Sequence, residues 1–185
     1  MARTALTLCG SLRRASWNGV LRRHVSGRLR AAGAEVTDLD LNDFAMPVFN
    51  EDIEKAGETP AAAGELARLF ATADIVFIAS PENNGGVTAA LKNTIDWVSR
   101  QKHGQWRRAV WGIGAVSSGK YGGVMGLSHL RDTLSKVGCL VVPTLLGVGP
   151  AEGAFDAEGN PVEPAIIRKC EQIVREMMEF SRGSA

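Results

Sequence analysis

Short apolar runs alternate with amphipathic segments along the whole chain. Runs of mainly apolar residues predict five β-strands, at Thr4–Cys9, Glu35–Leu41, Asp74–Ser80, Ala109–Ser117 and Cys139–Gly147. The run at residues 74–80 is apolar at almost every position, which is typical of a parallel strand that is covered on both faces.

Between these runs, apolar residues recur every three to four positions, which is the spacing of one face of a helix. The stripes predict five helices and consist of Leu21, Val25, Leu29 and Ala32; Leu66, Leu69 and Phe70; Leu91, Ile95 and Val98; Leu127, Leu130, Leu134 and Val137; and Ile166, Cys170, Ile173 and Met177. We interpret each stripe as core. Strands that alternate with helices predict an α/β fold, a doubly wound five-stranded parallel sheet with helices on both faces.

Length and composition limit the class of protein. We expect a single domain over residues 1–185, a length that allows a sizeable core. No apolar run approaches the roughly 20 residues of a membrane-spanning helix, so no membrane partner is expected. The net charge of +1 argues against a nucleic-acid partner.

The cysteines and histidines do not form a metal-binding pattern. Cys9, Cys139 and Cys170 show no C-x-x-C and no ligand spacing, and the three histidines, one of them His103, are scattered. We therefore expect no metal site. An odd number of cysteines at apolar positions indicates reduced thiols and a cytoplasmic protein.

Basic residues are concentrated at the start of the chain. Residues 1–34 contain seven arginines and no acidic residue, which leaves a net charge of −6 for the remainder. Such a start is also typical of a transit peptide, but cleavage would remove the predicted strand at residues 4–9. A local anionic ligand is the preferred interpretation.

In doubly wound sheets, ligands bind at the carboxyl ends of the strands. The first such loop is GSLRRASWN at residues 10–18, which leads into a helix and so turns backbone N–H groups and the helix dipole towards one point. Donors that suit a phosphate monoester are Ser11, Arg13, Ser16 and Asn18. Taken alone, the loop could also be a solvated basic turn.

A phosphatase loop is a further hypothesis for the same stretch. A thiolate at Cys9 would need a C-x5-R pattern, which places the arginine at position 15, but that residue is Ala15. Cys9 is therefore interpreted as a small core residue.

The second and third loops complete the expected site. Residues 82–86 supply amides and flexible backbone before a helix and could hold a planar heterocycle, although a glycine-rich turn has the same composition. Residues 114–120 fit G-x-x-x-x-G-K, but Tyr121 stands where an NTPase requires Ser or Thr for magnesium. We interpret Ser117, Ser118 and Gly119 as a third wall of one site.

Together these loops resemble the NADPH-dependent FMN reductase family, flavodoxin-like flavoproteins that include chromate, quinone and azo-dye reductases. GSLRRASWN is similar to the family's G-S-x-R-x-x-S-x-N phosphate loop. PENN followed by LKNTIDW resembles P-E-Y-N and L-K-N-A-I-D-W, and the SSG, GG and HLR stretches between residues 117 and 131 also match.

The resemblance implies a bound FMN and NADPH or NADH as the substrate. It implies that Ser11, Arg13, Ser16 and Asn18 hold the FMN phosphate. The residues it places along the ribityl chain and the isoalloxazine ring are Pro81, Glu82, Asn83, Asn84, Gly85, Ser117 and Gly119. It also implies a homodimer or homotetramer. No catalytic side chain is expected, because the flavin N5 atom carries the chemistry.

One departure bears on the substrate. Asn83 stands where the family has an aromatic residue after Pro-Glu, and the usual proline before the next helix is replaced within GGVTAA. Acceptor size and the choice between NADH and NADPH therefore stay open.

The leading hypothesis is an NAD(P)H-dependent oxidoreductase that reduces a flavin, a quinone or a similar small acceptor by a ping-pong cycle. The alternative is a flavodoxin-type electron carrier.

Overall fold

Five parallel strands form one sheet in the order β2-β1-β3-β6-β7 in a computed structural model that describes residues 2–102 and 104–181. Their bounds are Thr4–Cys9 for β1, Glu35–Leu39 for β2, Ile75–Ala79 for β3, Val110–Val116 for β6 and Leu140–Val148 for β7. Strand β1 pairs with β2 on one side and with β3 on the other, so the chain crosses over β1 between β2 and β3. The order reverses between β1 and β3, where flavodoxin-like sheets bind their ligands.

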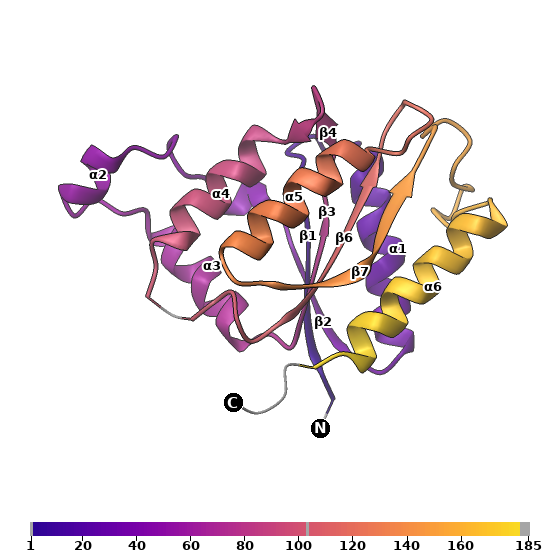
Figure 1. Ribbon diagram of the computed structural model, residues 1–185, viewed down its shortest axis with the longest axis horizontal. Coiled ribbons are helices and arrows are strands. Elements are labelled where there is room, and N and C mark those ends of the chain that lie inside the picture. The colour runs from indigo at the N-terminus through magenta and orange to yellow at the C-terminus, as the bar shows by residue number, and fades with distance from the viewer. Residues whose placement is uncertain (1, 103, 182–185) are drawn as a thin grey trace.

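Helices cover both faces of this sheet (Figure 1). One face packs against α1 and α6, and the other packs against α3, α4 and α5. Their bounds are Trp17–Ala31 for α1, Ala61–Thr72 for α3, Ala89–Ser99 for α4, Val124–Lys136 for α5 and Pro164–Glu179 for α6. The predicted flavodoxin-like doubly wound fold is confirmed.

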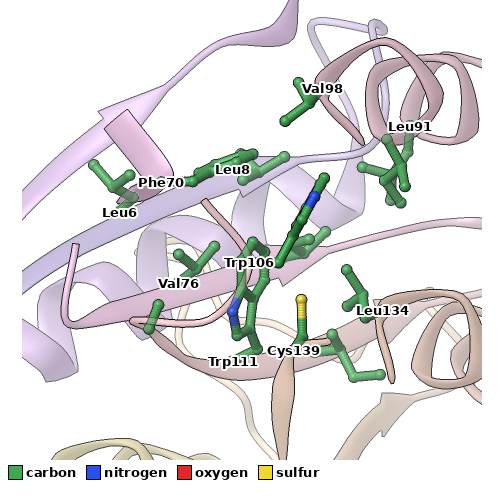
Figure 2. Packing of buried hydrophobic residues seen from close by; sticks show 14 of the residues in the cluster. Leu6, Leu8, Phe70, Val76, Leu91, Val98, Trp106, Trp111, Leu134 and Cys139 are labelled. Carbon is green, nitrogen blue, oxygen red and sulfur yellow. The ribbon is translucent and has the colours of Figure 1, made fainter. Parts of the chain in front are cut away.

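The two faces enclose separate apolar cores. Figure 2 shows the core under α3–α5, where Trp106 and Trp111 pack with ring centroids 5.7 Å apart and Phe70 meets Trp111 edge-on. On the other face, Gly112 of β6 lies so close to Met177 of α6 that a Cβ at this position would overlap the methionine sulfur. Both cores support the strand ends that carry the loops.

Some predicted boundaries differ from the structure. The strand predicted at residues 35–41 ends at Leu39 and is followed by a 3-10 turn, η1, at Leu41–Asp43. Ala32, the last residue of the first predicted stripe, is exposed and not part of the core. The helix α1 ends at Ala31, and Ala32 is its C-cap. Three short elements were not predicted: α2 at Glu51–Lys55, β4 at Glu82–Asn83 and β5 at Gly86–Val87.

Candidate functional site

Loops at the carboxyl ends of the strands surround a cleft of about 690 Å³. It lies at the β1–β3 switch point, with walls from the loops after β1, β3, β6 and β7. Of the eleven site residues expected from the sequence, those that line it are Ser11, Arg13, Ser16, Asn18, Pro81, Glu82, Asn83 and Ser117. Asn84, Gly85 and Gly119 are not among the lining residues. The structure thus brings all three predicted loops to one place.

The loop after β1 presents unpaired donors at the start of α1. Ser16 is the N-cap, and its Oγ accepts the N–H of Asn18 at 3.3 Å. The N–H groups of Leu12 and Trp17, which line the cleft, have no hydrogen-bond partner within the described residues. The first turn of α1 holds no acidic residue. An anion at this end of the cleft would therefore meet both free N–H donors and the positive end of the helix dipole.

Asn18 has a structural task that the sequence did not reveal. Its side chain is buried, donates to the carbonyl of Val116 at 2.9 Å and accepts the N–H of the same residue at 2.8 Å. The carbonyl oxygen and one of the two N–H groups of the side-chain amide are thus occupied, which fastens α1 to the end of β6. The second N–H of the same amide takes no part in these two bonds, so its donation to a phosphate stays a prediction.

The second loop is a hairpin, β4–β5, with a two-residue turn. Asn84 and Gly85 form this turn with φ angles of 51° and 76°, the left-handed backbone that a type I′ turn requires. An Asn-Gly pair between extended residues is the strongest short signal for such a turn, so the sequence could have revealed it. The turn lies beyond the cleft wall, and Asn83, before it, lies in that wall.

Two side chains fix the hairpin in place. Glu82 accepts the N–H of Gly126, in the first turn of α5, at 2.7 Å, and so caps a helix whose own N-cap, Gly123, offers no side chain. Thr88 is the N-cap of α4 and donates to the carbonyl of Gly10 at 2.6 Å. The second loop is therefore tied to α5 on one side and to the first loop on the other.

The third and fourth walls come from the loops after β6 and β7. Ser117 Oγ accepts the N–H of Gly119 at 3.2 Å, which curls the loop after β6. Gly122, with φ of 61°, lies so close to the end of β7 that a Cβ would stand 2.6 Å from the nitrogen of Val148. The fourth wall, residues 150–152, was not predicted, although it follows a strand that ends at the same edge of the sheet.

The basic start of the chain has a different explanation from the one that we expected. Arg22 and Arg30 pair with Asp38, and Arg28 pairs with Glu171. Arg3 donates to the carbonyls of residues 177 and 178 at the end of α6. Most of this charge therefore joins elements of the fold, and of the seven arginines in residues 1–34 only Arg13 lines the cleft.

Charge and burial shift the pKa of two groups near this region. Burial raises the pKa of Asp38, but hydrogen bonds from Arg30, Thr7 and Ser26 and the charge of Arg22 outweigh it and lower the pKa to about 2. Burial raises the pKa of the Cys9 thiol, and hydrogen bonds from Ser11 and Ser16 offset this only in part. Cys9 is therefore held as a thiol, which does not suit a thiolate nucleophile.

The described residues offer neither a metal-ligand cluster nor a membrane-spanning helix. No group of three or more His, Cys, Asp or Glu side chains there could hold a metal ion; His103 lies outside these residues. No helix there has the length and apolar character needed to cross a bilayer.

Comparison with protein families and sequences identifies relatives over most of the chain. The family model for NADPH-dependent FMN reductase matches residues 4–153. An NAD(P)H-dependent FMN reductase from Pseudomonas aeruginosa is 30% identical over 176 residues, which cover 94% of this chain and 90% of that protein. A quinone reductase from Escherichia coli K12 is 34% identical over 159 residues, which cover 85% of this chain and 83% of that protein.

Solved structures resemble this one over nearly their whole length. A flavoenzyme NAD(P)H:(acceptor) oxidoreductase from Paracoccus denitrificans has a TM-score of 0.78 at 23% identity, covering 98% of this chain and 100% of that chain. An NAD(P)H:quinone oxidoreductase from Methanothermobacter marburgensis has a TM-score of 0.69 at 18% identity, covering 100% of both chains. At such identities the likeness shows the fold alone.

Proposed function

The chain belongs to the NADPH-dependent FMN reductase family, and we propose that it transfers electrons from NAD(P)H to a quinone, a flavin or a similar small acceptor by a ping-pong cycle. It is an NAD(P)H-dependent FMN/quinone oxidoreductase with FMN as its cofactor. The acceptor, the kinetic order and the residues that serve each step are the parts that we propose.

The observation that carries the proposal is the arrangement of donors at one end of the 690 Å³ cleft. Two unpaired N–H groups at the start of α1 lie beside the hydroxyls of Ser11 and Ser16 and the guanidinium of Arg13, a set that suits a phosphate monoester. The residues present therefore fit FMN, whose phosphate they would hold.

The other walls would hold the rest of the cofactor. Backbone groups of the hairpin strand at residues 81–83 and of Ser117 would border the ribityl chain and the ring. Three of the expected residues would act indirectly. The type I′ turn at Asn84 and Gly85 would hold Asn83 in the cleft wall. Gly119 would position Ser117 by donating its N–H to the Ser117 Oγ. Asn18 would support the phosphate loop through Val116 and would have its second side-chain N–H left to donate to the phosphate.

When bound, FMN supplies hydride acceptance at N5 and electron delivery to the acceptor. The chain's own task is to bind the substrates, orient them and exclude water. Asn83 is exposed on the cleft wall, so no aromatic side chain at this position covers the mouth. An uncovered mouth admits a nicotinamide or an acceptor of varied size, one at a time.

Steady-state kinetics test whether the nicotinamide and the acceptor bind in turn at the same opening of the cleft. Rates measured against NADPH at several fixed quinone concentrations should give parallel double-reciprocal lines. Lines that intersect would mean that both substrates are bound together, and the ping-pong proposal would then be wrong.

A flavodoxin-type carrier is the competing function, and the charge around the cleft does not favour it. Carriers dock on partner proteins through a strongly charged rim. Here the acidic residues that line the cleft are Glu82 and Glu152, of which Glu82 is bound to α5, and Arg13 opposes them. This balance suits small anionic substrates better than a basic redox protein.

We also propose that the protein is a homodimer or homotetramer in the cytoplasm. Tyr121, just before α5, and Val124 and Met125, at its start, are exposed close together in the chain and next to the third wall, and a partner could cover such an apolar patch. None of the three cysteines forms a disulfide, which suits a reducing compartment. Light scattering of the FMN-loaded protein tests the assembly, and a monomeric mass would refute it.

A further inference from the structure

A second groove, of about 620 Å³, runs along α1 beside the cleft. One wall is a stripe of α1 that includes Trp17, Val20, His24 and Gly27, one position on each successive turn. From residue 17 to residue 27 this stripe extends about 15 Å, at 1.5 Å per residue. Trp17 lines both the groove and the cleft. The groove is therefore a continuation of the cleft, from the end where the phosphate donors lie.

The α1 wall presents a cation that the fold does not use. Of the four arginines in α1, Arg22, Arg28 and Arg30 pair with carboxylates, whereas Arg23 has no partner among the described residues. The guanidinium of Arg23 is exposed at the groove. A phosphate in the groove would meet a free charge rather than one already neutralised.

Next to Arg23, His24 offers a neutral polar group. Burial lowers its pKa, and a hydrogen bond with the side chain of Asn160 offsets this in part. The charges of Arg28 and Asp156 act on it in opposite directions. A largely neutral imidazole can accept or donate a hydrogen bond without adding charge.

The opposite wall, the turn at residues 156–160, is acidic. Asp156 accepts the backbone N–H of Asn160 at 2.7 Å and its side-chain amide at 3.3 Å, which makes the turn rigid. Glu158 also lines the groove and has no ion-pair partner among the described residues. Carboxylates repel a simple anion but accept hydrogen bonds from hydroxyl and amino groups. The groove thus suits a ligand that carries phosphate together with such donors.

An aromatic face completes the groove at the end shared with the cleft. Trp17 is 41% exposed and stacks on Phe155 with ring centroids 6.1 Å apart and an interplanar angle of 11°. The stack holds the indole in position, with Val20 one turn further along α1. A planar base could lie against this surface.

We propose that the groove binds the adenosine-phosphate half of a dinucleotide whose other half lies in the cleft. Arg23 receives the phosphate, the acidic turn receives the ribose hydroxyls and the adenine amino group, and Trp17 and Val20 contact the base. The inference rests on the proposed function, because NAD(P)H must place its nicotinamide in the cleft. FAD carries the same adenosine-phosphate chemistry and is the other source.

Adenosine 2′,5′-bisphosphate is the probe, titrated by calorimetry into the FMN-loaded protein. Arg23→Gln should weaken its binding about tenfold, the loss expected for one hydrogen bond to a charged group at a solvated site. Arg68→Gln is the matched control, since Arg68 is also exposed on a helix and has no ion-pair partner among the described residues; binding should be unchanged.

A second variant fills the groove without removing a charge. A Cβ at Gly27 would meet no atom within 4 Å, so Gly27→Met should fold normally and weaken the probe by occluding its space. Far-UV circular dichroism and the flavin spectrum check folding. Unchanged probe binding in both Arg23→Gln and Gly27→Met would overturn the proposal.

Two further measurements identify the source of the adenosine. If NADPH uses the groove, Arg23→Gln raises the KM for NADPH and leaves kcat unchanged. If FAD uses it, the variant loses affinity for FAD relative to FMN. Should NADPH fail to reduce the flavin while the probe still binds in an Arg23-dependent way, the proposed function is wrong and the adenosine site stands.

Discussion

Replacing Arg13 by alanine tests the phosphate end of the cleft. The Arg13 side chain lines the cleft and makes no hydrogen bond with the described residues, so its removal leaves the fold intact. A hydrogen bond between a charged donor and a phosphate contributes about 1.5–3 kcal/mol. Arg13→Ala should therefore weaken FMN binding roughly ten- to a hundredfold, with the lower figure favoured because the guanidinium is exposed and screened by water.

Arg14→Ala is the matched control. Arg14 has the same charge and exposure but does not line the cleft. Its charge acts instead near Asp40, whose pKa is lowered mainly by hydrogen bonds from Asn42 and also by the charges of Arg22 and Arg14. Its removal should change FMN affinity by less than about threefold, through long-range attraction that salt screens.

Titration of each apoprotein with FMN, followed by quenching of flavin fluorescence, measures the two affinities. Raising the ionic strength should reduce the effect of Arg14→Ala to nothing and leave most of the effect of Arg13→Ala. Equal and negligible effects of the two substitutions would refute the reasoning, and the loop would then be a solvated basic turn.

Three further predictions follow from other parts of the structure. Asn18→Ala leaves the N–H and the carbonyl of Val116 buried and unpaired, so urea denaturation of the apoprotein should show a loss of about 2–4 kcal/mol; an unchanged midpoint would contradict the clamp. Because the pKa of Asp38 falls from 3.8 to about 2 on folding, its stabilisation is complete above about pH 4 and disappears as the pH falls towards 2. After allowance for partial exposure this amounts to about 1–2 kcal/mol, and Asp38→Asn should remove that part of the acid dependence in pH-dependent unfolding. Asn83→Tyr should narrow the mouth and slow bulky quinones more than small ones; equal relative rates across a size series would show that position 83 does not face the acceptor.

Hydrophobic spacing was sufficient to predict the sheet and its helices. The run at residues 74–80 became the fully buried strand β3, and stripe residues such as Leu21 and Leu91 lie in the two cores. These positions are apolar because they are buried, and burial of one face of a helix or strand produces the periodic spacing seen in the sequence. Elements without an apolar face escaped this reasoning, as α2 shows, since none of its residues is buried.

The candidate site was predicted less completely, because residue type does not reveal which partner a polar group has. Asn18 carries a donor that a phosphate requires, but Val116, 98 positions away in the chain, takes one of its two side-chain N–H groups and its carbonyl oxygen. Arg22 likewise pairs with Asp38 of the neighbouring strand. Such long-range pairs form only when α1 packs against the assembled sheet. The Asn84-Gly85 turn, by contrast, is local, and turn chemistry alone could have located it.

Reduction of the bound flavin by pyridine nucleotide tests the central claim most directly. The purified protein, loaded with FMN and kept anaerobic, is mixed with a slight excess of NADPH or NADH while its visible absorption is followed. The account predicts rapid bleaching of the flavin band and recovery of the colour when a quinone is added. Failure of both nucleotides to bleach the flavin, together with rapid bleaching by a flavodoxin reductase, would contradict it and identify an electron carrier.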